Sequence, residues 1–319
     1  MRTALDETTD WHPGTPAGPA QPEELQVPVA GGQLAVLRWP ADPARAGVGT
    51  APVVLAAHGI TSNALAWSLV AEQLGGAVTL LAPDLRGRAG SRRVRGPYGI
   101  GAHADDLVRV LDVLGVERAV LAGHSMGAFA AAVAAGRAPE RVDHVVLVDG
   151  GLPLAVPRWL NPDLLLYGAL DPGMQQLGST FRSRAAYQSY WRRHPAMRRD
   201  WSSHLAAHLD RDLIGSVLTL RSSVVQRAVR ADAAAVLRDE ETLTAVRRLT
   251  CPSTLLWAPR GMRDEAGGLY TARGLARACL DPDWVRVVEV EDVNHYTVLL
   301  GARGAGAVAR ELLRAAGSG

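Results

Sequence analysis

The sequence contains no lysine and only two cysteines. All 34 of its basic side chains are arginines, which excludes Schiff-base chemistry and a lysine general base. Cys251 and Cys279 have neither the spacing of a metal site nor the number that a disulfide framework needs. We interpret both cysteines as small residues that fill the core, and we expect no metal and no organic cofactor.

Long apolar runs are also missing. No run approaches the ~20 residues of a membrane span, and residues 1–23 lack the apolar centre of a signal peptide. The net charge of +2 is too small to indicate a nucleic-acid surface. We expect a cytoplasmic protein with a loosely packed tail over residues 1–23, which acts on a small molecule and binds neither nucleic acid nor membrane. The sequence leaves the oligomeric state open, with a homodimer as one alternative.

Short apolar runs alternate with helical stretches along most of the chain. The predicted strands are residues 24–30, 33–39, 53–57, 78–82, 119–122, 145–148, 254–257 and 285–290. The predicted helices are residues 64–74, 103–114, 126–138, 269–280 and 298–316. Because buried strands that alternate with helices form parallel sheets, we predict an α/β fold with a mostly parallel central sheet and helices on both faces.

Residues 151–245 interrupt this alternation. They contain no clear strand, several aromatic residues and helical segments such as residues 210–230. This pattern predicts a helical cap inserted into a core formed by residues 24–150 and 246–319. Trp159, Tyr187 and Trp191 are its candidates for an apolar substrate wall.

Three histidines of the predicted cap are less informative. His194, His204 and His208 lie among arginine, serine and aspartate residues. We interpret them as residues on solvated helix faces.

The strongest local pattern is Gly123-His-Ser-Met-Gly127, between an apolar strand and an alanine-rich helix. A serine between strand and helix lies on a tight turn, and the two glycines allow helix and strand to approach closely. The turn exposes the Ser125 hydroxyl and directs the Met126 backbone N–H, at the positive end of the helix, toward the same point. We predict that Ser125 is a nucleophile.

A second pattern follows the strand at residues 53–57, which ends in His58-Gly59. A turn there could supply the Ile60 N–H as a second oxyanion donor beside Met126. Each such donor is worth about 2.7–4 kcal/mol by analogy with measured cases. His58, Gly59 and Tyr296 are also candidates for contact with substrate, although a structural role in the loop is the main interpretation of His58.

His295 follows the last predicted strand and therefore faces the same sheet edge as Ser125. Its place near the end of the chain fits the order serine, acid, histidine. We predict that His295 is the general base.

Together these residues resemble the α/β-hydrolase superfamily, over roughly residues 24–318. The stretch Asp84-Leu-Arg-Gly-Arg-Ala-Gly-Ser91 is similar to a DxRGxGxS loop of that family, with Ala89 in place of a glycine. The resemblance implies a serine hydrolase with a catalytic triad, an oxyanion hole and structural roles for Asp84 and Arg86.

The triad acid has more than one candidate. In the family it commonly follows the penultimate strand, where Asp264 comes three residues later than expected. Asp149, at the end of the strand at residues 145–148, is the alternative, and Glu265, or no acid at all, is the third. We prefer Asp264, but the sequence does not decide.

The expected reaction is hydrolysis of an ester, thioester or lactone of a small apolar substrate through an acyl-enzyme on Ser125. The same triad could cleave a carbon–carbon bond or act as a perhydrolase. A third alternative is a binding protein that senses a small ligand. A serine nucleophile argues against haloalkane dehalogenases and epoxide hydrolases, which use a carboxylate.

Overall fold

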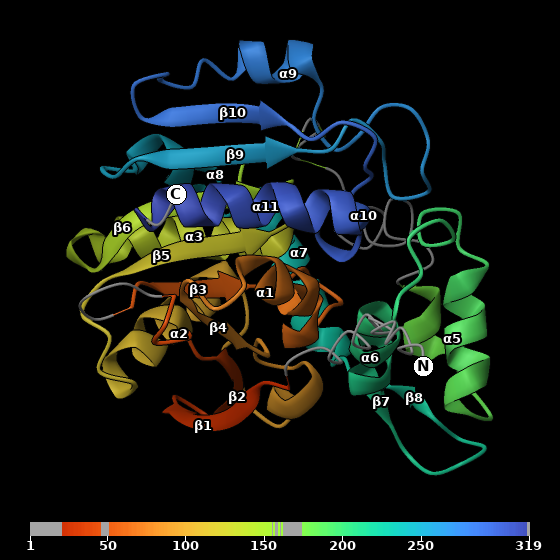
Figure 1. Ribbon diagram of the computed structural model, residues 1–319. Coiled ribbons are helices and arrows are strands. Elements are labelled where there is room, and N and C mark those ends of the chain that lie inside the picture. The colour runs from red at the N-terminus through yellow and green to blue at the C-terminus, as the bar shows by residue number, and fades with distance from the viewer. Residues whose placement is uncertain are drawn as a thin grey trace, which may run out of the picture.

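The computed structural model describes residues 21–45, 51–154, 156, 159, 161 and 174–317. Within them eight strands form one sheet in the order β1-β2-β4-β3-β5-β6-β9-β10 (Figure 1). Their bounds are β1 Glu23–Val29, β2 Gly32–Trp39, β3 Val53–Ala57, β4 Thr79–Pro83, β5 Ala119–His124, β6 Val142–Val148, β9 Ser253–Trp257 and β10 Val285–Glu289. The tail expected over residues 1–23 lies almost entirely outside the described residues.

The strand directions confirm the predicted mostly parallel sheet. β1 and β2 form an antiparallel hairpin, and β2 also pairs antiparallel with β4. All other neighbours in the sheet are parallel. The carboxyl ends of β3, β5, β6 and β9 therefore meet at one edge, where loops can bring side chains together.

Helices cover both faces of this sheet. They are α1 Ser68–Leu74, α2 Ile100–Val113, α3 Met126–Arg137, α9 Ala272–Arg277, α10 Thr297–Leu300 and α11 Ala302–Ala315. α1 packs with α11 on one face, and α2 packs with α3 on the other (Figure 1). β5 is buried along its whole length because both of its faces are covered.

The cap elements stand beyond the carboxyl ends of the strands (Figure 1). They are α5 Arg184–Arg192, α6 Ser203–Asp212, β7 Leu213–Ile214 and β8 Arg221–Ser222. The helix expected over residues 210–230 is wrong, because α6 ends at Asp212 and β7 and β8 then form a hairpin. Gly215, with φ of 106°, permits that turn. The Asp212 carboxylate also accepts hydrogen bonds from Ser222 and Ser223 beyond the hairpin.

Two helices that follow the hairpin return to the sheet. α7 Gln226–Arg238 and α8 Glu240–Thr244 pack against α3, although the sequence pattern groups them with the cap. Cys251 is buried as expected, whereas Cys279 is exposed, which corrects that part of the expectation. Among the described helices, none combines the length and apolar character that crossing a membrane requires.

Candidate active site

Ser125 lies between β5 and α3 in a strained backbone conformation, with φ of 54° and ψ of −119°. A side chain on either flanking glycine would not fit: a Cβ on Gly123 would lie 2.2 Å from the Gly127 oxygen, and a Cβ on Gly127 would lie 2.3 Å from the Ala57 oxygen. The two glycines therefore let strand and helix approach closely, and the turn between them exposes the Ser125 hydroxyl to a pocket.

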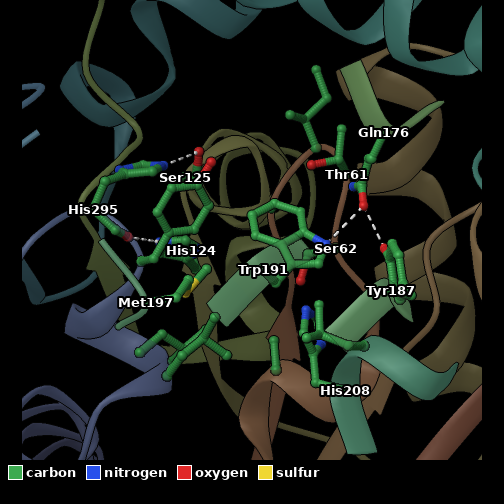
Figure 2. A pocket seen from close by; sticks show the side chains of 17 residues that line it. Thr61, Ser62, His124, Ser125, Gln176, Tyr187, Trp191, Met197, His208 and His295 are labelled. Atoms are coloured by element: carbon green, nitrogen blue, oxygen red, sulfur yellow. Dashed lines mark hydrogen bonds between the residues drawn. The ribbon is translucent and has the colours of Figure 1, made fainter. Parts of the chain in front are cut away.

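His295 reaches Ser125 from the loop that follows β10. Its Nε2 lies 3.1 Å from Ser125 Oγ (Figure 2). The His124 ring supports this loop, because its Nε2–H donates to the His295 carbonyl at 2.8 Å. Burial lowers the pKa of His124 to about 3, so its ring is neutral at ordinary pH.

Asp149 lies directly after β6 and is fully buried. His295 Nδ1–H donates to its Oδ2 at 2.6 Å, and the Ala258 N–H donates to its Oδ1 at 3.1 Å. The Asp149 backbone N–H donates to the Leu256 carbonyl at 2.7 Å, which fixes the residue against β9. Ser125, His295 and Asp149 thus form a continuous chain of hydrogen bonds.

The preference for Asp264 beside His295 is corrected by this geometry. Asp264 Oδ1 instead accepts from Asn294 Nδ2 at 3.0 Å and pairs with Arg260 Nε at 2.9 Å. The loop folds on itself, with hydrogen bonds between Gly261 and Glu265 and between Asp264 and Gly261. The extra residues of this loop are used in these local contacts. Glu265 also bonds its own loop, through the Arg263 N–H at 2.7 Å.

The Gly59-Ile60 turn lies against the nucleophile. A Cβ on Gly59 would be 3.4 Å from Ser125 Cβ, and Gly59 and Ile60 both line the pocket. Arg88 fixes this turn from behind, since its Nε and Nη2 donate to the Ile60 carbonyl at 3.0 and 2.8 Å. Met126 is the first residue of α3, where backbone N–H groups have no partner within the helix.

His58 is buried and does not line the pocket in the described part of the chain. Its Nε2 accepts from the Leu85 N–H at 2.9 Å and its Nδ1–H donates to the Gly59 carbonyl at 2.7 Å. Burial lowers the pKa of His58 and keeps the ring neutral. Its geometry corresponds to the structural role in the loop, so its inclusion among substrate contacts is corrected.

The pocket in front of Ser125 has a volume of about 60 Å³. Tyr187 and Trp191 line it as the sequence suggested (Figure 2). Tyr296 and Gly59 line it as well. Trp159 does not: its side chain is 80% exposed. Trp159 therefore faces solvent, and the expected contact with substrate is wrong at this position.

Several pocket residues could not be identified from the sequence. Gln176, Met197 and His208 line the pocket, although no motif marks them. The solvated faces expected for the three cap histidines are wrong, because His194, His204 and His208 are all buried. His204 Nε2 lies 2.7 Å from Glu72, and His208 Nδ1 lies 3.1 Å from Asn63 Oδ1. Contacts across the cap–core boundary therefore bury these rings.

Comparisons with known proteins agree with this architecture. A sequence model described as the alpha/beta hydrolase fold matches residues 52–302. Uncharacterised proteins of Mycobacterium bovis and Mycobacterium tuberculosis are 37% identical over 103 residues, 32% of this chain but only 30% of theirs. The match thus spans under a third of the length of these curated relatives.

A longer match is to the 2-(acetamidomethylene)succinate hydrolase of Mesorhizobium japonicum, 29% identical over 250 residues, which are 78% of this chain and 83% of that protein. Among solved structures, the thioesterase domain from the curacin biosynthetic pathway has a TM-score of 0.69 at 22% identity, covering 92% of this chain and 99% of that one. At this identity the structural likeness shows the fold.

Proposed function

Since the chain belongs to the α/β-hydrolase fold family, we propose that it is a serine hydrolase that cleaves an ester, thioester or lactone of a small substrate through an acyl-enzyme on Ser125. One observation carries the proposal. Ser125 Oγ, His295 Nε2, His295 Nδ1 and Asp149 Oδ2 are joined by hydrogen bonds of 3.1 and 2.6 Å at the wall of a pocket.

The chain of hydrogen bonds assigns each group a role. Asp149 accepts a hydrogen bond from His295 Nδ1–H, which leaves Nε2 unprotonated and able to take the Ser125 proton as the hydroxyl attacks the carbonyl. The backbone N–H groups of Ile60 and Met126 stabilise the oxyanion. His295 then returns the proton to the leaving alcohol or thiol. Water, deprotonated by the same nitrogen, releases the acid and restores Ser125.

Amide hydrolysis is a second candidate. The relative from Mesorhizobium japonicum that matches 78% of this chain is named for hydrolysis of an acetamido compound. The same triad can cleave an amide if His295 protonates the leaving nitrogen. Matched p-nitrophenyl esters and p-nitroanilides separate these two bond types.

Labelling with a fluorophosphonate and turnover of p-nitrophenyl esters of increasing chain length test the proposal. We expect stoichiometric labelling of wild type, and we expect Ser125→Ala to lose labelling and on the order of 10⁶ in kcat. Ser216→Ala, an exposed serine of the β7–β8 hairpin, is the matched control and should retain both. Labelling without turnover of any ester or anilide would instead favour carbon–carbon hydrolysis or a ligand sensor, and absence of labelling would refute an activated Ser125.

A further inference from the structure

Gln176, on the cap side of the pocket, has a carboxamide whose orientation is fixed by its partners. Its Oε1 accepts from Trp191 Nε1 at 3.0 Å and also contacts the Tyr187 hydroxyl (Figure 2). An indole N–H can only donate, so the amide atom that faces Trp191 must be the carbonyl oxygen. The Tyr187 hydroxyl is itself fixed by Asp212 Oδ2 at 2.8 Å. The Nε2 group of Gln176 must therefore point away from this cluster.

The Nε2 group is a hydrogen-bond donor available to a ligand. The Gln176 residue is only 2% exposed and lines the same pocket as Ser125 and His295. Within the described residues, Nε2 makes no hydrogen bond. The Nε2 atom is not among the fully buried polar atoms that lack a partner, so it is open to the pocket. A free amide donor on a pocket wall is thus suited to pair with a bound molecule.

The charge of the pocket restricts what that molecule can carry. No arginine is among the described residues that line the pocket. Two of its three lining histidines, His124 and His208, are neutral near pH 7, because burial lowers their pKa values to about 3 and about 4; the third is His295 of the triad. A carboxylate placed there would lose hydration without gaining a cation, which is strongly unfavourable. The pocket therefore favours an uncharged hydrogen-bond acceptor.

We propose that Gln176 determines specificity: its Nε2 donates to a neutral oxygen, such as a ketone, on the acyl part of the substrate away from the scissile carbonyl. The inference rests on the proposed function, because it assumes an acyl group on Ser125. It adds a substrate class, namely neutral acyl groups with a second, remote carbonyl. The relative from Mesorhizobium japonicum would differ in substrate charge, because it is named for a succinate, which carries carboxylates.

The test compares three series of p-nitrophenyl esters: 4-oxopentanoate and its longer keto homologues, the methyl-branched isosteres, and the monosuccinate. We expect wild type to prefer the best keto ester over its isostere by about tenfold in kcat/KM, the usual worth of one hydrogen bond. The monosuccinate should be the poorest substrate. In Gln176→Leu the ratio of kcat/KM between the keto ester and its isostere should fall to about one. Because leucine also removes the Oε1 that Trp191 and Tyr187 contact, this ratio, rather than either rate, is the readout.

Gln188→Leu is the matched control, because Gln188 is also a cap glutamine but bonds Asp210 rather than lining the pocket. This variant should retain the keto preference. Binding of the corresponding methyl esters to Ser125→Ala, measured by calorimetry, gives the same comparison without turnover. If the keto preference is absent in both assays, or survives Gln176→Leu, the inference about Gln176 is wrong. If wild type turns over no ester of the three series while Ser125→Ala still binds the keto ester more tightly than its isostere, the proposed hydrolysis is refuted and the inference about Gln176 stands.

Discussion

The two walls of the pocket are built in different ways. On the core wall, Ser125, Asp149 and His295 each follow a strand of the sheet, and backbone contacts fix their positions. On the cap wall, side-chain hydrogen bonds hold the residues: Gln176 contacts Tyr187 and Trp191 within the cap, and His208 contacts Asn63, 145 residues away. The setting of the proposed nucleophile therefore depends on local backbone geometry, whereas the proposed specificity residue depends on side-chain contacts within the folded cap.

The core wall makes the strongest prediction, because Asp149 and Asp264 are two carboxylates near one histidine loop. Asp149→Asn should lower kcat by about 10⁴, since an amide at that position permits the wrong His295 tautomer. Asp264→Asn should lower kcat by less than about tenfold, since Asp264 contacts Asn294 and Arg260 instead. Steady-state kinetics on the best ester, with folding checked by circular dichroism, measures both. A larger loss in Asp264→Asn than in Asp149→Asn would contradict the assignment.

The same contrast explains what the sequence could predict. Ser125 and its strand–turn–helix setting follow from Gly123-His-Ser-Met-Gly127 and the apolar strand and alanine-rich helix that flank it, and the order of strands places His295 at the same edge. The choice between Asp149 and Asp264 could not be made, because it depends on how residues 261–265 fold on themselves. Gln176 could not be found either. Its position depends on Tyr187 and Trp191, 11 and 15 residues further along the chain, and only the folded cap brings these side chains together.

Gly150, which no sequence pattern marked, provides a second test of the core wall. A Cβ at this position would lie 2.2 Å from the Ser125 carbonyl oxygen, a backbone atom that cannot move without disturbing the nucleophile. Gly150→Ala should therefore reduce the free energy of unfolding by about 3 kcal/mol and also lower kcat.

Gly136→Ala is the control for this prediction. Gly136 lies in α3, and a Cβ there meets nothing within 4 Å. The substitution should stabilise the helix by up to ~1 kcal/mol and leave kcat unchanged. Urea denaturation of the two variants gives the comparison, and equal losses of stability would show that close approach at Gly150 is unimportant.

The cap wall makes a smaller, pH-dependent prediction. Burial lowers the pKa of His208 from 6.5 to about 4, so the folded protein keeps this ring neutral where the unfolded chain has already bound a proton. In that window the unfolded state binds more protons, and the free energy of unfolding must fall as pH falls. Between pH 8 and pH 5 the contribution of His208 to this loss should be roughly 1–2 kcal/mol.

His208→Asn tests this contribution, because asparagine does not titrate and is close in size to the part of the ring that contacts Asn63. At pH 8 wild type should be more stable than the variant by about 1 kcal/mol, because asparagine leaves part of the space of the ring empty. At pH 5 the difference should vanish or change sign. Urea denaturation at both pH values measures this, and parallel pH profiles would mean that His208 is not a buried neutral ring. His208 would then be open to water at its contact with Asn63 and could take up a proton. A charged ring on the cap wall could pair with a charged substrate, so the wall would not exclude one.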